Sequence, residues 1–131
     1  MMMSYRPERR SCERFPVPGG TVDWAPESDP GDVSTECAIG DLSRGGVRIL
    51  TTGPAAKGTA IRVTLLVPGE AAPLSFRGTV VWTQVSSGQL QNMAVAFAPY
   101  TDAPGDNAPA ALERLVAIEA RYVSPREPQE S

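Results

Sequence analysis

The sequence predicts an all-β protein: a six- to seven-stranded antiparallel, split β-barrel followed by a C-terminal α-helix. Short segments in which apolar and polar residues alternate recur between residues 21 and 97. The 13 prolines and 12 glycines mark frequent turns between these segments. Only after residue 106 does the apolar spacing become helical. A closed barrel suits many short strands, because closure leaves no strand edge unpaired.

The first predicted strand covers residues 21–24 and follows a segment in which Pro16 and Pro18 disfavour a helix. Residues 25–35 form a long loop with two prolines and three acids, which would repel phosphates if it folded over an anion site. Two further strands, "ECAIGDL" and "VRIL", flank a polar bend at residues 43–46. The first half of the barrel is therefore built around this bend.

The second half contains a strand at residues 61–67, another at 74–85, the hairpin loop "SSGQ" and a last strand at 93–97. Alternation in the first of these places four side chains on a buried face: Ile61, Val63, Leu65 and Val67. In the next strand, Phe76, Val80 and Trp82 share one face. The aromatic residues that we expect in the core are Phe15, Trp24, Phe76 and Trp82.

The C-terminal helix is predicted to begin with Asp106 or Asn107 as its N-cap, to have Pro109 in its first turn and to stop at Pro125. Its apolar stripe, which should pack on the barrel, consists of Ala111, Leu115, Ile118 and Tyr122. The chain thus divides into a flexible basic arm (1–14), the barrel with its helix (15–123) and a disordered tail (124–131).

Composition excludes several classes of function. No apolar run approaches the roughly 20 residues of a membrane span, and the N-terminus does not resemble a secretory signal, so we expect a cytoplasmic protein with no membrane insertion. Cys12 and Cys37 are too few for a disulfide framework or a zinc site and are read as reduced thiols. Histidine is absent and no nucleophile, phosphate-loop or dinucleotide motif is present, which argues against an enzyme or a metal site.

Two short polar clusters remain to be explained. Residues 1–14 hold four arginines against two glutamates, although the whole chain has a net charge of −3. Within them "RSCER" places Arg10 and Arg14 four residues apart, and the bend "DLSRGG" supplies Asp41, Ser43 and Gly46. Alone, the first cluster is ordinary surface charge and the second ordinary turn chemistry. Both clusters in this order, before a strand-rich chain with "GTVVW" and "MAVAF", resemble the PilZ domain family over about residues 6–122.

The resemblance implies a receptor for cyclic di-GMP that needs no other cofactor. The ligand-binding residues that it implies are Arg10, Arg14, Asp41, Ser43 and Gly46, with Arg9, Arg44 and Gly45 as further candidates. This ligand carries two guanines and two phosphates. An arginine fork can meet guanine O6 and N7, or stack on the purine while donating to phosphate.

The bend residues suit the same ligand. The carboxylate of Asp41 can accept from guanine N1 and N2, which adenine cannot match. Ser43 can accept from guanine or donate to phosphate, and Gly46 permits close backbone approach or a positive φ. The bend and the arm would therefore form two halves of one guanine-recognition surface.

We expect a stand-alone receptor that relays its signal to an unidentified effector protein through ordering of the N-terminal arm. The alternative is a PilZ-like adaptor that binds proteins and no nucleotide. A third interpretation, a small barrel that binds single-stranded RNA, is disfavoured by the acidic body and the few aromatic residues, so neither DNA nor RNA is an expected partner.

Overall fold

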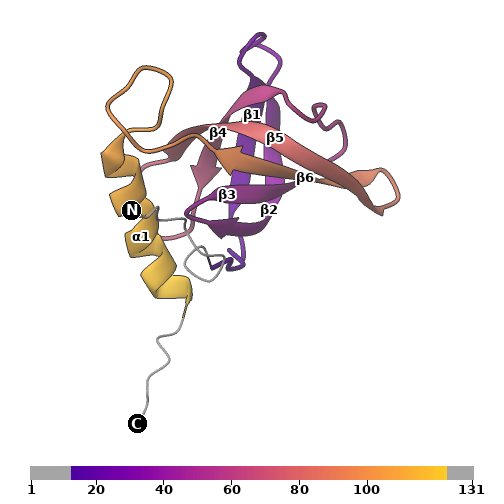
Figure 1. The fold of residues 1–131 in the computed structure, drawn as a ribbon. Coiled ribbons are helices and arrows are strands. Elements are labelled where there is room, and N and C mark those ends of the chain that lie inside the picture. The colour runs from indigo at the N-terminus through magenta and orange to yellow at the C-terminus, as the bar shows by residue number, and fades with distance from the viewer. Residues whose placement is uncertain (1–12, 124–131) are drawn as a thin grey trace, which may run out of the picture.

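The computed structural model describes residues 13–123, which form a closed six-stranded barrel with one helix, as predicted (Figure 1). The elements in chain order are β1 (Thr21–Pro26), β2 (Ser34–Ser43), β3 (Gly46–Thr51), β4 (Ala60–Leu66), β5 (Leu74–Ser87), β6 (Leu90–Phe97) and α1 (Pro109–Tyr122). All neighbouring strands are antiparallel in the order β1-β2-β3-β6-β5-β4. The barrel closes because β1 pairs with β2 along one edge and with β4 along the other.

The core fills the barrel and follows the predicted alternation. In β4 and directly after it, the four predicted inward side chains are all buried: Ile61, Val63, Leu65 and Val67. Phe76 and Val80 in β5 and Met93 and Val95 in β6 are buried as well. Period-two alternation fixes which face of each strand meets the core, because a one-residue slip would expose the whole set.

Trp82 does not belong to this core, contrary to the sequence-based prediction. The register of β5 against β6 shifts between Val80 and Trp82, so one extra residue of β5 lies between these two pairs. This β-bulge reverses the alternation, because side chains beyond an inserted residue point to the opposite face. Trp82 is 39% exposed on the outside of the barrel, whereas Phe15, Trp24 and Phe76 are buried as expected.

The segment before β1 is fixed to the barrel by Phe15. Its backbone N–H and C=O pair with the C=O and N–H of Leu42 near the end of β2, both at 2.9 Å. Its ring is 2% exposed and stacks on Tyr122 of α1 with centroids 5.7 Å apart. These contacts position the preceding residue, Arg14, beside the end of β2.

The N-cap of α1 is one residue after Asn107 and two residues after Asp106, the two predicted caps. Ala108 is the N-cap and makes no side-chain cap bond, while Pro109 is in the first turn as predicted. The Asn107 side chain instead accepts from the Arg77 N–H (2.7 Å) and donates to the carbonyls of Arg77 and Ala98. The predicted cap residue therefore fastens the loop before α1 to β5 and to the residue that follows β6.

The helix α1 lies beside the barrel (Figure 1), with Leu115 and Ile118 buried. Ala111 and Tyr122 are partly buried against the core, so the predicted apolar stripe is confirmed. The helix ends at Tyr122, and Pro125 lies outside the described residues. Within residues 13–123, no helix has the length and apolar composition that crossing a membrane requires.

Candidate functional site

The polar bend is the two-residue turn between β2 and β3, closed by the pair Ser43–Gly46. Ser43 is buried, and its Oγ accepts from the Gly45 N–H (3.1 Å) and donates to the Gly46 carbonyl (3.4 Å). The Gly45 carbonyl accepts from the Phe97 N–H (2.9 Å), which fixes the turn against β6. The serine hydroxyl therefore stabilises the turn through its backbone hydrogen bonds.

Gly46 is required because β3 and β6 approach closely at this point. A Cβ on Gly46 would lie 2.1 Å from the carbonyl oxygen of Val95, which is far inside van der Waals contact. Gly46 is not among the glycines of residues 13–123 with positive φ. Of the two reasons expected for this glycine, close backbone approach is the one that applies.

Asp41, on β2, forms ion pairs with the arginine of the N-terminal segment and with an arginine of β3. Arg14 Nη1 donates to Asp41 Oδ1 (2.9 Å), and Arg48 Nε donates to Asp41 Oδ2 (3.0 Å). Both pairs lie on the outside of the barrel, where the Arg14 side chain is 57% exposed. Each carboxylate oxygen has a second lone pair, so Asp41 can hold both arginines and still accept from a ligand.

Arg48 is a site residue that the sequence analysis did not identify. It pairs with Asp41 across β2 and β3, and its Nη1 also donates to Asn92 Oδ1 on β6. Its guanidinium passes over Gly40, where an added Cβ would come within 2.6 Å of Cζ. The sequence contains a signal for this residue. Alternation in the segment "VRIL" places Arg48 on the outward face, between Val47 and Ile49, which are buried.

A cleft of about 290 Å³ lies beside this cluster on the outer face of the sheet. Its residues come from the N-terminal segment, the turn and strands β3, β5 and β6: Arg14, Ser43, Gly45, Gly46, Val47, Val81, Trp82, Ala94, Val95 and Ala96. Gly46 pairs with Ala96, and Ala94 pairs with both Arg48 and Trp82. Small residues of β3 and β6 therefore form part of the floor between Arg14 and Trp82.

The remaining predicted residues lie in different places. Arg9 and Arg10 fall outside the described residues. Arg44 Nε donates to Glu119 Oε1 of α1 (2.7 Å), and its carbonyl accepts from the Tyr100 hydroxyl (2.7 Å). Arg44 therefore connects the turn to the helix and is not among the residues that line the cleft. The structure brings together Arg14, Asp41, Ser43, Gly45 and Gly46.

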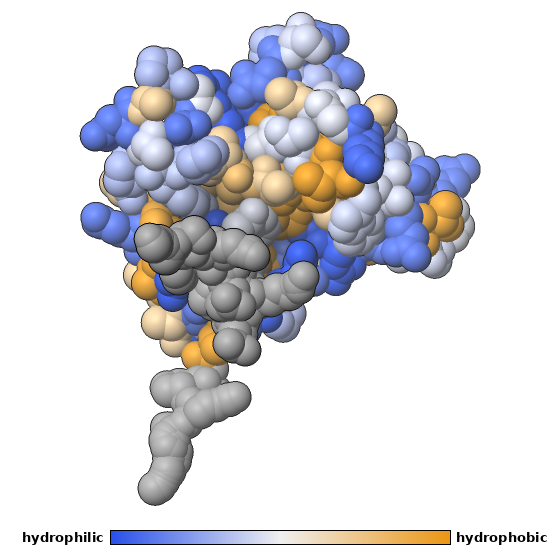
Figure 2. Space-filling model, viewed as in Figure 1, coloured by the Kyte–Doolittle hydropathy of each residue, from blue (hydrophilic) through white to orange (hydrophobic). Residues whose placement is uncertain are grey.

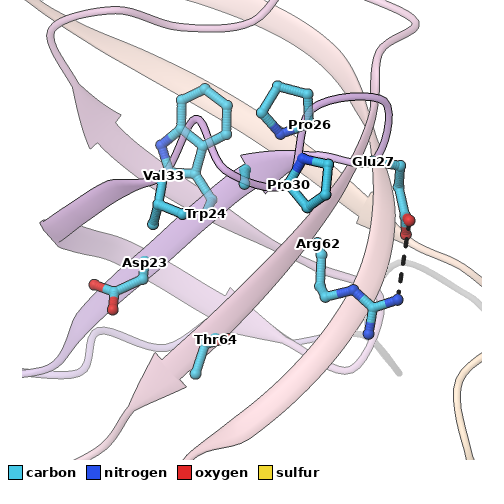
Figure 3. Close-up of a pocket in the computed structure, with 9 residues that line it drawn as sticks. Asp23, Trp24, Pro26, Glu27, Pro30, Val33, Arg62 and Thr64 are labelled. Atoms are coloured by element: carbon cyan, nitrogen blue, oxygen red, sulfur yellow. Dashed lines mark ion pairs between the residues drawn. The ribbon is translucent and has the colours of Figure 1, made fainter.

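A separate pocket of about 160 Å³ lies at β1 and β4, away from these residues (Figure 3). Trp24, Pro26, Pro30 and Val33 supply its apolar wall, and Arg62 pairs with Glu27 at 3.9 Å. Asp23 and Glu27 line it against the single cation Arg62, a balance that does not favour a phosphate ligand. The acidic loop after β1 lies here, so its acids do not line the cleft beside Arg14.

No group of three or more metal-ligating side chains of the kinds His, Cys, Asp and Glu occurs among residues 13–123. The polar groups that line the cleft are the Arg14 guanidinium, the Ser43 hydroxyl and the turn backbone. Asp41 and Arg48 are not lining residues but adjoin it, because Asp41 pairs with Arg14 and Arg48 pairs with Asp41. This set can bind an anion or a planar donor–acceptor edge.

Comparison with known proteins identifies the family and the fold. The family model of the PilZ domain matches residues 8–117. The PilZ domain of YcgR from Escherichia coli, solved with c-di-GMP, superposes with a TM-score of 0.60 at 18% identity, over 85% of this chain and 88% of that one. A search of curated proteins finds no match.

Two longer proteins share the fold. The Bacillus subtilis inhibitor of motility MotI/DgrA gives a TM-score of 0.61 at 16% identity, and the K. pneumonia MrkH–c-di-GMP complex gives 0.62 at 15%. The matches cover 89% and 85% of this chain but 54% and 51% of those chains, so this chain spans about half their length. The family match extends over most of the sequence and confirms the resemblance: the chain belongs to the PilZ domain family.

Proposed function

We propose that this chain is a non-enzymatic, cytoplasmic receptor that binds cyclic di-GMP in the cleft between Arg14 and Trp82. The observation that carries the proposal is the 2.9 Å ion pair between Arg14 and Asp41, which joins two sequence motifs 27 residues apart at one cleft. Two relatives with this fold were solved with the same ligand, which supports the choice among nucleotides.

The charges and shapes at the cleft suit this ligand. Arg14 and Arg48 outnumber the single carboxylate between them, so an anionic phosphate is attracted to this face. Trp82 is 39% exposed and offers an indole face on which a guanine can stack. The floor of glycine and alanine allows the base to approach the strands. Asp41 orients both arginines and accepts from the guanine edge.

Isothermal titration calorimetry with Arg14→Ala tests this assignment. Loss of a charge-assisted contact should weaken cyclic di-GMP binding by about tenfold or more. Arg62→Ala is the matched control, because Arg62 is an exposed arginine on β4, across the barrel from β3. It should bind as the unaltered chain does.

Cyclic di-AMP should bind weakly or not at all, because adenine lacks the N1 and N2 donors that Asp41 accepts. Equal affinities of Arg14→Ala and Arg62→Ala, or no binding of cyclic di-GMP by the unaltered chain, would favour the adaptor function instead. The same titration of Arg10→Ala extends the test to a predicted residue outside the described range.

We propose further that the bound ligand holds residues 1–14 against the cleft and that an effector protein recognises the changed surface. Phe15 supports this relay because it fixes the end of that segment beside Leu42 and under Tyr122. The residues that precede Phe15 are therefore attached to the barrel next to the cleft, and a change in their position would alter the surface there.

A further inference from the structure

The strand β5 is longer than the strand beside it, and half of one edge has no partner. The ladder between β4 and β5 ends at Ala60–Thr79, and the last backbone bonds on this edge are those of Val80 to Gly58 and Thr59. Beyond Val80, β5 continues to Ser87, paired only with β6. The other edge of β6 is covered by β3 as far as Thr51–Gln91. Among residues 13–123, nothing pairs with the outer edge of residues 81–87.

This edge lacks the features that usually prevent strand pairing. Residues 78–101 contain no Lys, Arg, Asp or Glu, and no proline occurs between Pro73 and Pro99. Charged residues and prolines are the common means by which exposed edges are kept from adding another strand. Several large apolar side chains of the hairpin are exposed, with Val85 66% exposed and Val81, Trp82 and Leu90 between 37% and 39%. Figure 2 shows hydrophobic colour at the end of this hairpin, where it projects from the barrel.

We propose that the outer edge of residues 81–87 pairs in antiparallel fashion with the same edge of a second copy of this chain. The chain as a whole is acidic, with a net charge of −3, so two copies repel each other over most of their surface. At the uncharged hairpin, two copies can meet without this electrostatic repulsion. A two-fold axis across the edge places the same seven residues on both sides, which gives a closed interface.

The register of β5 narrows the geometry of this pairing. The ladder with β6 is regular from Trp82 to Val85, between irregularities at either end. A two-fold axis that relates paired strands of one sheet is normal to the sheet and keeps each side chain on its own face, so the residue at the axis lies opposite its own copy. With the axis at Gln84, Thr83 of one copy lies opposite Val85 of the second. Aromatic and β-branched residues across a strand pair stabilise it, whereas like charges there are destabilising. The absence of charge matters because any charged residue near the axis would meet its own copy.

Analytical ultracentrifugation of the full chain, from about 10 µM to about 1 mM, tests the proposal, because a seven-residue strand pair buries less than a standard interface and gives a weak dimer. We expect a monomer–dimer equilibrium within this range. Val85→Lys should raise the dimer dissociation constant by about tenfold or more, because the two lysines lie diagonally across the axis on the same face of the sheet. Val33→Lys is the matched control, since Val33 is an exposed valine at the other pocket, 47% exposed.

Circular dichroism verifies that each variant is folded, and Thr83→Lys serves as a second variant if Val85→Lys fails to fold. Hydrogen exchange should show protection of residues 81–87 that rises with protein concentration. A chain that stays monomeric throughout would overturn the proposal and leave an extended peptide as the occupant to test. Equal dimerisation of Val85→Lys and Val33→Lys, or protection confined to other residues, would also overturn it.

Discussion

At the scale of single residues, the candidate site contains a few positions whose residue type is explained by one structural contact each. Asp41 matters because its two oxygens hold two arginines from different parts of the chain. Ser43 matters because its hydroxyl closes the turn. Gly46 matters because the carbonyl of Val95 occupies the space of a side chain. The residues proposed to bind the ligand therefore also have structural roles in the turn and the strands around it.

Replacing Gly46 by alanine should destabilise the barrel. The new Cβ meets backbone rather than a flexible side chain, so β3 and β6 must separate, and we expect a loss of about 2–4 kcal/mol in the free energy of unfolding. Gly53→Ala is the control, because no atom lies within 4 Å of its added Cβ. Urea denaturation of both variants is the measurement. A loss for Gly46→Ala no larger than for Gly53→Ala would show that the strands can separate freely.

At the scale of elements, α1 is attached to the barrel through charged side chains in its middle and C-terminal turns. Glu70, in the loop before β5, forms ion pairs with Arg114 and Arg121 of α1, each at 3.1 Å. Arg44 in the β2–β3 turn pairs with Glu119. These pairs are partly exposed and contribute little individually, so the buried stripe supplies most of the attachment. Their value is orientation, because the Arg44–Glu119 pair links the helix to the turn that lines the cleft and the Glu70 pairs link it to the loop before β5.

The loop between β6 and α1 should depend on Asn107. This side chain is 5% exposed and makes three hydrogen bonds to backbone groups of Arg77 and Ala98. Asn107→Ala leaves those groups without their partners, and we expect a loss of about 2–4 kcal/mol in the free energy of unfolding. The neighbouring Asp106→Ala removes only an acceptor for the Thr101 hydroxyl and should cost less than about 1 kcal/mol. Equal midpoints in urea for the two variants would contradict this role.

At the scale of the whole molecule, the barrel provides a rigid outer face on which segments distant in sequence meet. Asp41, Arg48, Ala94 and Trp82 lie in register across β2, β3, β6 and β5. Phe15 brings the N-terminal segment to one side of this row through its pairing with Leu42. A ligand bound there contacts strands and the N-terminal segment together.

Limited digestion with trypsin should report the proposed relay. Trypsin cleaves after arginine unless proline follows, so Arg9 and Arg10 of residues 1–14 are cleavage sites, whereas Arg6 precedes Pro7. If the ligand holds this segment against the cleft, saturating cyclic di-GMP should slow cleavage there several-fold, because a protease acts on extended, accessible chain. Mass spectrometry of the fragments over time gives the rates, and Arg14→Ala is the control that should show no slowing. Unchanged rates with bound ligand would leave the receptor assignment intact and remove the relay.

The sequence by itself determined the strand and helix order, most of the core and the motif residues. Alternation and helical spacing are local properties, and the buried faces of β4 and α1 follow from them directly. The two motifs were also recognisable because both occur, in order, before a strand-rich chain. Residues 1–12 and 124–131 lie outside the described range, so the predictions for Arg9, Arg10 and the tail stay predictions.

Only the tertiary structure decided how these parts meet. The bulge that turns Trp82 outward, the pairing of Arg48 with Asp41 and the unpaired edge of β5 all depend on a partner strand that is distant in sequence. Asn107 is not the N-cap for the same reason. Its side chain makes three hydrogen bonds to backbone groups of Arg77 and Ala98, which are distant in sequence. Register between strands is set by contacts across the sheet, which no local pattern of residues contains.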